Sequence, residues 1–186
     1  APNHEAALWI CDSLAPCLKS RGVDPSTLVV AGRRPRPLLA KRAAAAGIEL
    51  RADVPDMTSV LAEAAVAIAP MALASGPNAK VLEAVFAGRP CVISPAANTA
   101  LSLQDGHSAL IRDRDPVAFT DAIIELLVDE RKRERIAEAA RTRLRRHVPE
   151  TVIESWRRNL HMMMDEPTLS PVNDGPSTTK TRPAID

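Results

Sequence analysis

Short apolar runs alternate with longer helix-forming stretches through most of the chain, and this alternation limits the possible folds more than any other feature. The run TLVVA, for example, is followed by Gly32 and then by an alanine-rich stretch that ends at Gly47. Five runs have the composition of buried strands: 27–31, 48–51, 66–69, 91–94 and 109–111. Parallel strands need crossover connections, so the alternation predicts an α/β fold with a Rossmann-like parallel sheet of about five strands flanked by helices.

Helices are predicted between and after these strands, with glycine or proline at several of their ends. Gly47 follows one such stretch, and Pro116 stands just inside the start of another, with Asp115 as its N-cap. The predicted helices cover 5–19, 38–46, 58–64, 79–87, 117–128, 131–147 and 150–164. We therefore expect one folded domain over residues 1–164. The remainder, 165–186, is rich in proline and poor in apolar residues, and we expect it to be a disordered tail.

Composition and charge argue against several classes of protein. The 186 residues include 24 basic and 23 acidic side chains, and only 2% of them are aromatic. Neither a chain-wide positive field nor a platform for stacking bases is available, so no nucleic-acid partner is expected. Three cysteines without a C-x-x-C pair favour neither disulfides nor zinc, and no segment resembles a membrane span or a secretion signal. These features predict a cytoplasmic protein that holds no metal.

A loop that turns into a helix, ASGPNAKVLE at 74–83, carries the densest set of candidate functional residues. Ligands of parallel sheets bind beyond the carboxyl ends of the strands, and this loop follows the third predicted strand. Gly76 allows close approach to the backbone, and the N–H groups and dipole of a helix start favour an anionic diphosphate. Lys80 would add positive charge, and Glu83, on the same helix face, could accept hydrogen bonds from a ribose diol. The spacing also fits a simple ion pair on a solvated face.

A longer stretch, VAIAPMALASGPNAKVLEAVFAGRPCVIS, resembles the donor-site signature of retaining GT-B glycosyltransferases of the family 4-like, group 1 class. The resemblance starts at Pro2 and continues through LVVAG, ADVPDM and DRDPVAF, so that it covers residues 2–164. It implies that the chain is the C-terminal, donor-binding half of a GT-B fold and that an N-terminal acceptor domain is missing before Ala1. It also implies sugar transfer from a UDP- or GDP-sugar with retention, without metal or cofactor, in polysaccharide or glycolipid synthesis.

The resemblance assigns a task to each residue at the start of this helix. Glu83 matches the carboxylate that holds the ribose. The backbone around Gly76, Asn78 and Ala79 would meet the phosphates. Lys80 is then the catalytic residue, because its charge would stabilise the departing nucleoside diphosphate.

Five further positions belong to the implied nucleotide-sugar site. Val54, in the ADVPD loop, would border the base through its backbone, and Ser94 would line the donor cleft. Gly32 and Arg33 follow the first strand, where Arg33 or its neighbour could replace a phosphate clamp of arginine and lysine that this family often carries. Ser75 departs from the family pattern, which has a sugar-binding glutamate at that position.

Two charged segments lie outside that site. Asp113 and Asp115 form a D-x-D sequence like a metal-binding motif, but Asp115 directly precedes a helix start, which favours a capping role. The basic stretch 131–146, bounded by Arg131 and Arg146, is typical of a solvated helix face. Contact with anionic lipid headgroups at the inner face of the membrane is the second interpretation of this stretch.

Two other functions stay open on the sequence alone. A non-catalytic membrane-associated or scaffolding module could keep this fold after losing the sugar-binding glutamate at Ser75, acting through the basic stretch 131–146. A nucleotide-sugar epimerase-like half-domain would share the architecture. Nucleotide binding separates the first of these from a glycosyltransferase.

Overall fold

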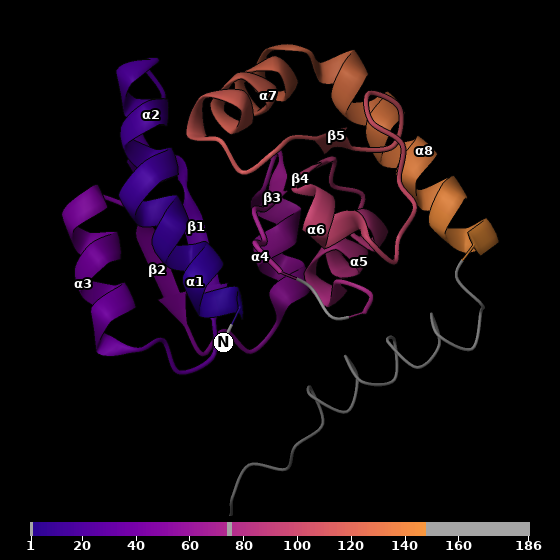
Figure 1. Cartoon of the computed structure of the whole chain (residues 1–186). Coiled ribbons are helices and arrows are strands. Elements are labelled where there is room, and N and C mark those ends of the chain that lie inside the picture. The colour runs from indigo at the N-terminus through magenta and orange to yellow at the C-terminus, as the bar shows by residue number, and fades with distance from the viewer. Residues whose placement is uncertain (1, 74–75, 148–186) are drawn as a thin grey trace, which may run out of the picture.

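The computed structural model describes residues 2–73 and 76–147, which form parallel strands with helices packed on both faces (Figure 1). The predicted α/β architecture is confirmed. The strands are β1 (Val29–Gly32), β2 (Glu49–Ala52), β3 (Ala67–Ala69), β4 (Cys91–Ile93) and β5 (Leu110–Ile111). Each lies within one residue of its predicted run except the first, which begins at Val29 because a short 3₁₀ turn, Pro25–Thr27, precedes it.

The helices agree closely with the predicted ones. They are α1 (Pro2–Trp9), α2 (Ala15–Ser20), α3 (Pro37–Ala46), α4 (Met57–Glu63), α5 (Ala79–Phe86), α6 (Pro95–Asn98), α7 (Pro116–Val128) and α8 (Glu130–His147). A π-helical turn, Ile10–Leu14, joins α1 to α2, so the predicted first helix is continuous but starts earlier. The short α6 was expected to be a loop. The predicted helix at 150–164 and the predicted tail lie outside the described residues.

The five strands form two parallel sheets, whereas the alternation predicted one. β1 pairs with β2, in the register Val29 opposite Glu49, and β3, β4 and β5 pair in that order, with Val92 opposite both Ile68 and Leu110. The prediction of parallel pairing is therefore confirmed, but the sheet is divided because β1 and β3 are not hydrogen-bonded to each other.

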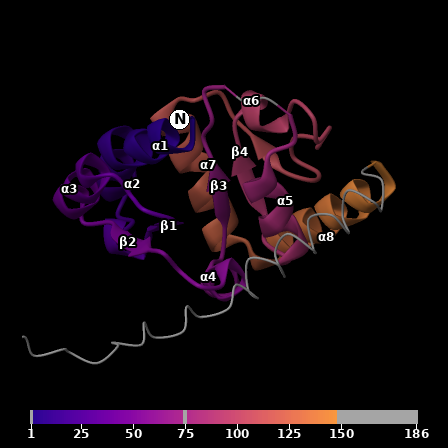
Figure 2. The same ribbon diagram turned by 90° about the horizontal axis from the view of Figure 1, so that it is seen from below.

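Apolar side chains form a core on each face of the strands. One cluster joins α1, α2, α3 and α7 through residues such as Leu14, Leu39 and Phe119, and the other joins α5 and α8 through Leu82 and Leu144. β4 is buried at all three residues and serves both clusters, because alternate side chains of a strand point to opposite faces. Figure 2 shows the three layers that result, with α5 and α8 on the side away from α1.

Helix ends follow the capping signals of the sequence. Gly47 takes a left-handed conformation, with φ 74°, at the end of α3, as glycine can without steric cost. The Asp115 carboxylate accepts a hydrogen bond of 2.8 Å from the Ala118 N–H, which confirms the predicted cap of α7. None of the described helices combines the length and apolar character needed to cross a bilayer.

Candidate functional site

The carboxyl ends of β3 and β4 are held together by Ser94. Its N–H donates to the Ala69 carbonyl at 3.1 Å, and its hydroxyl donates to the Met71 carbonyl at 2.7 Å. The same hydroxyl accepts a bond of 3.3 Å from the Ala97 N–H and so caps α6. The resemblance had implied that Ser94 lines the donor cleft. Only 1% of Ser94 is exposed, so this residue does not line an open cleft and instead supports the loop from beneath.

The loop after β3 leads into α5, which begins at Ala79. The Asn78 side chain accepts a 3.1 Å bond from the Lys80 N–H and caps the helix, which occupies one of the N–H groups available to an anion. Gly76 has φ +88°, and a Cβ built on it would meet nothing within 4 Å, so the backbone is open to an approaching group. Ser75 lies outside the described residues.

Lys80 and Glu83 lie one turn apart on α5, on the side away from the core. Val81, Leu82 and Val85 are at most 1% exposed and anchor the opposite side of the helix, as the sequence predicted. Lys80 is exposed and Glu83 is half-buried. Burial raises the pKa of the Glu83 carboxyl above its ordinary value, and the positive charge of Lys80 partly offsets this. The two charges therefore interact, and the Glu83 carboxyl is partly shielded from water.

A second group of predicted residues lies at the carboxyl ends of β1 and β2. The Asp53 N–H donates to the Gly32 carbonyl, and the Arg34 N–H donates to the Asp53 carboxylate, both at 2.9 Å. These bonds hold Gly32, exposed Arg33 and half-buried Val54 at one edge. Arg34 and Asp53 adopt φ of 45° and 50°, which is uncommon for residues with a Cβ and costs energy.

Asp56, two residues after Val54 in the same loop, caps the start of α4. The Asp56 carboxylate accepts bonds from the Thr58 and Ser59 N–H groups at 2.8 and 3.2 Å, and the hydrogen bond from Thr58 lowers the pKa of this carboxyl. The loop that was predicted to border the base is thereby fixed to the start of α4.

Sequence reasoning missed a cluster that fastens α1 to the loop after β5. Arg114 forms an ion pair with Glu5, and its guanidinium lies 5.1 Å from the centre of the Trp9 ring. Trp9 in turn meets Phe119 edge-on, with ring centres 5.4 Å apart. Arg114 is the middle residue of the D-x-D sequence, so that sequence holds helices in place. Among the described residues, no three histidine, cysteine or acidic side chains gather as metal ligands.

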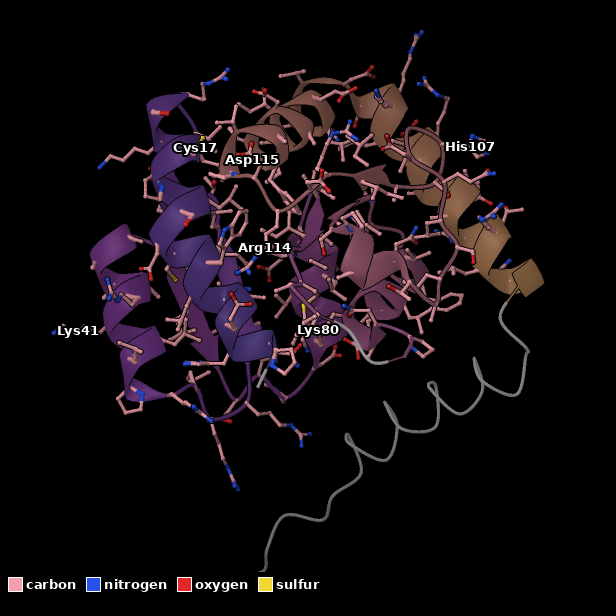
Figure 3. The ribbon with its side chains drawn as sticks, in the orientation of Figure 1. Cys17, Lys41, Lys80, His107, Arg114 and Asp115 are labelled. Atoms are coloured by element: carbon pink, nitrogen blue, oxygen red, sulfur yellow. The ribbon has the colours of Figure 1, made fainter. Side chains whose placement is uncertain are left out.

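Figure 3 labels Arg114 near the centre of the molecule, with Lys80 below it and Lys41 at the outer side of α3. Lys80 is thus well separated from Lys41, although both are exposed lysines on helices. Cys91, by contrast, is 2% exposed within β4, and burial raises the pKa of its thiol to about 12. This cysteine is a core residue, as the sequence suggested.

Much of the basic stretch 131–146 is engaged within the protein. Arg133 donates to the Leu126 and Leu127 carbonyls at the end of α7, and Lys132 pairs with Glu125. Other contacts tie Arg141 to Glu138 and Arg143 to the Ser102 carbonyl. Of the arginine and lysine side chains that the structure describes in this stretch, Arg131, Arg135 and Arg145 are exposed.

Comparison with known proteins shows which family the chain belongs to. A family model described as "Glycosyl transferases group 1" matches residues 1–129. The chain belongs to this family. The glycosyltransferase chain matches no curated protein sequence.

Solved structures agree with this glycosyltransferase family in fold. A TarM mutant from S. aureus, crystallised with fondaparinux, alpha-GlcNAc-glycerol and UDP, is 15% identical with a TM-score of 0.66; the match covers 86% of this chain and 33% of TarM. A UDP-forming alpha,alpha-trehalose-phosphate synthase from Burkholderia xenovorans is 14% identical with a TM-score of 0.63 and coverages of 88% and 42%. Both are GT-B enzymes, so the predicted half of a GT-B fold is confirmed. The chain spans less than half the length of either.

Proposed function

We propose that this glycosyltransferase domain is the donor-binding half of a retaining enzyme that transfers a sugar from a UDP- or GDP-sugar to an acceptor. The observation that carries the proposal is the start of α5 at the carboxyl end of β3, where Gly76, Lys80 and Glu83 lie together within the matched residues. TarM, a structural neighbour, was solved with UDP bound.

The proposed diphosphate site uses the backbone at the start of α5 together with Lys80. The open space beside Gly76 admits a phosphate, and the positive end of the helix dipole favours it. Because Asn78 caps the Lys80 N–H, the exposed ammonium of Lys80 supplies most of the charge. Lys80 is then the catalytic residue, since it stabilises the charge that grows on the leaving diphosphate.

The proposed ribose site is the Glu83 carboxylate. A half-buried carboxylate makes stronger hydrogen bonds than a fully hydrated one, and two hydroxyl donors of a ribose compensate its burial. Gly32, Arg33 and Val54 would flank the nucleotide from the neighbouring edge, with Val54 toward the base. Ser94 supports the site from below through the Met71 carbonyl.

An N-terminal domain would supply the acceptor site, and the enzyme would act in polysaccharide or glycolipid synthesis in the cytoplasm. We also propose that the enzyme attaches to the inner face of a membrane. This attachment would rest on Arg131, Arg135 and Arg145, which are exposed among the basic side chains of α8 that the structure describes. Few exposed charges give weak attraction to anionic lipid, about 1 kcal/mol for each basic residue near the surface.

The test is titration of the 186-residue chain with UDP and with GDP, followed by amide resonances and calorimetry. We expect shifts at residues 76–83 with one of the two nucleotides. Glu83→Ala should weaken binding by about 1–3 kcal/mol, and Lys80→Ala should also weaken it, because each removes a charged partner of the ligand. Lys41→Ala, which removes an exposed lysine from α3, is the matched control and should leave binding unchanged.

Unchanged spectra at millimolar UDP and GDP would overturn this proposal. Capture of the chain by anionic vesicles, lost on reversing the charges of Arg131, Arg135 and Arg145, would then favour the scaffolding module instead. Binding of nucleotide that Lys80→Ala and Lys41→Ala weaken equally would show that α5 is not the phosphate site.

A further inference from the structure

A basic surface at the start of α3 has no role in the packing described so far. Residues 25–48 contain five basic side chains and no acidic one, in a chain with nearly equal numbers of both. Arg33, Arg34 and Arg36 lie in the loop between β1 and α3, and all three are exposed. Positive charge is therefore concentrated at one place, although the net charge of the chain is only +1.

The three guanidinium groups differ from most of the described arginine side chains in having no partner. Arg51 and Arg112, for example, form ion pairs with acidic side chains. No side-chain hydrogen bond or ion pair joins Arg33, Arg34 or Arg36 to another residue that the structure describes. Their donors are therefore available to a partner outside the chain.

The sequence at this point does not favour the stability of the helix that follows. Arg36 stands at the N-cap of α3, and its side chain makes no capping hydrogen bond. A cation is unfavourable at a helix N-terminus, because the helix dipole places partial positive charge there. Serine or aspartate at the same position would stabilise α3. Arg36 therefore does not serve the fold, which indicates a role in binding.

The backbone of this loop is held in one conformation. Pro35 and Pro37 each fix their own φ, and the Arg34 N–H donates to the Asp53 carboxylate at 2.9 Å. Asp53 offsets part of the positive charge, but it is a single carboxylate beside three guanidinium groups. Arg34 is kept at the uncommon φ of 45°. Binding at this loop therefore needs little further ordering of the backbone.

An exposed leucine lies beside these cations. Leu38, in the first turn of α3, is 49% exposed, whereas the next residue, Leu39, is 6% exposed and belongs to the core. Lys41 shares a helix face with Leu38, because residues three apart in a helix are neighbours. Figure 3 shows Lys41 at the outer side of α3. Free cations around an exposed apolar side chain are typical of a surface that contacts anionic lipid.

We propose that the surface formed by Arg33, Arg34, Arg36 and Leu38 docks on a bilayer rich in anionic phospholipids. The planar guanidinium groups would bind the headgroup phosphates, and Leu38 would enter the layer beneath the headgroups. Gly32 directly precedes this surface, so the edge that holds the proposed nucleotide site would face the lipid. This last consequence rests on the proposed function, whereas the docking itself does not.

Other partners and surfaces fit these observations less well. A single-stranded nucleic acid is bound through aromatic side chains that stack on its bases, and only 2% of the chain is aromatic. The exposed arginines of α8, named above for membrane attachment, form a separate surface. Figures 1 and 2 both show α3 and α8 at opposite sides of the molecule. Variants of the two helices can therefore distinguish the two contacts.

The experiment is co-sedimentation of the 186-residue chain, without nucleotide, with two kinds of vesicle. One kind is phosphatidylcholine alone, and the other is equal parts of phosphatidylcholine and phosphatidylglycerol. Arg34→Glu with Arg36→Glu reverses two charges of the proposed surface. The matched control is Arg131→Glu with Arg135→Glu, which changes the net charge equally at exposed positions of α8.

The parent chain should bind the anionic vesicles but not the neutral ones, and added salt should weaken binding because it screens the charges. Reversal at Arg34 and Arg36 should lower the partition coefficient at least about tenfold, and the α8 control by less than about threefold. Circular dichroism checks that each variant folds. If the reversed variant does not fold, Arg34→Gln with Arg36→Gln replaces it, with a loss of at least about fivefold expected.

A second pair of variants tests the apolar part of the surface. Leu38→Ser should weaken vesicle binding at least about threefold, because the leucine is the group that enters the lipid. Val128→Ser is the matched control, since Val128 is 78% exposed at the end of α7, and it should leave binding unchanged. Equal binding of these two variants would overturn the proposal.

Three further outcomes would also overturn it. The first is a parent chain that does not bind anionic vesicles, or that binds neutral ones equally well. The second is an equal or larger loss in the α8 control, which would assign the contact to α8. The third is tighter binding to a duplex RNA than to the vesicles, lost on reversal at Arg34 and Arg36. Because no nucleotide is present, none of these outcomes bears on the nucleotide site proposed at α5.

Discussion

The β3–β4–β5 sheet and the β1–β2 sheet differ in how completely they are buried. β4 is buried at every residue and has strands on both sides, whereas β2 carries Glu49 and Arg51, which form an ion pair with each other. Burial of apolar side chains therefore stabilises the β3–β4–β5 sheet more than the β1–β2 sheet. The second is held by one strand partner and by the helices α1–α2 and α3.

The loops at the ends of the two sheets differ in the same way. Buried Ser94 links β3 to β4, while the bond from Arg34 to Asp53 links β1 to β2 at the surface through two residues of positive φ. Exposed hydrogen bonds contribute less net stability because water replaces them at little cost. The proposed phosphate site is thus built on the more rigid sheet, and the residues that would flank the base belong to the looser one.

The largest expected difference between the sheets is in the cost of shortening a valine. Val92→Ala in β4, where the side chain is 0% exposed, should lower the free energy of unfolding by about 2–3 kcal/mol, from two lost methylene equivalents and the cavity left behind. Val29→Ala in β1, where the residue is 38% exposed, should cost less than about 1 kcal/mol. Urea denaturation measures both, and equal costs would contradict the contrast in burial.

A smaller difference is expected for two serines. Ser94→Ala should cost about 1–3 kcal/mol, because it leaves the Met71 carbonyl and the Ala97 N–H without their partner in a buried site. Ser59→Ala removes an exposed bond to the Asp56 carbonyl and should change stability by less than about 0.5 kcal/mol. Thermal unfolding of both variants tests this. A Ser94→Ala protein as stable as the parent would show that the hydrogen bonds of Ser94 do not stabilise the loop.

Two glycines extend the comparison to the backbone of the site. Gly76→Ala should cost about 1–2 kcal/mol, because φ +88° places its new Cβ near the following carbonyl oxygen. Gly32→Ala should be nearly neutral, since its φ is not in the left-handed range and a Cβ there meets nothing within 4 Å. Chemical denaturation is the measurement. A neutral Gly76→Ala would show that the loop relaxes, and nucleotide titration of that variant would reveal whether binding needs the original turn.

The smallest expected effect is a dependence on pH. The raised pKa of Glu83 means that the folded state holds its proton more tightly than the unfolded state, so the contribution of Glu83 to stability is full below the ordinary glutamate pKa and is lost as pH rises through the folded value. Glu83→Gln should therefore flatten the fall in stability above about pH 4.3. Unfolding free energies between pH 4 and pH 7 provide the test. Unchanged slopes would indicate a hydrated carboxylate.

Most of the local structure could be predicted from the sequence. The cap at Asp115, the left-handed Gly47 and the buried face of α5 depend on residues within a few positions of one another. The placement of Lys80 and Glu83 on one face of α5 followed from their spacing alone. Their roles toward a nucleotide stay a prediction, as does the part assigned to Arg33 and Val54.

Other features depended on contacts that no local pattern records. Glu5 and Arg114 are 109 positions apart, and nothing near either residue marks the other as its partner. Ser94 resembled a cleft residue because it follows a strand, but its burial depends on where the Met71 carbonyl comes to lie. The sequence placed Arg133 and Arg143 on a solvated helix face. In the structure they donate hydrogen bonds to the Leu126 carbonyl of α7 and to the Ser102 carbonyl.

The sequence by itself determined the order, type and approximate ends of the elements, together with the family of this glycosyltransferase domain, because these follow from short-range periodicity and motifs. Only the tertiary structure decided that β1 and β3 do not pair, that Ser94 is an internal brace and that Arg114 fastens α1. Such features require segments distant in the chain to meet, and the free energy of that meeting is set by burial and by hydrogen-bond partners that no single segment contains.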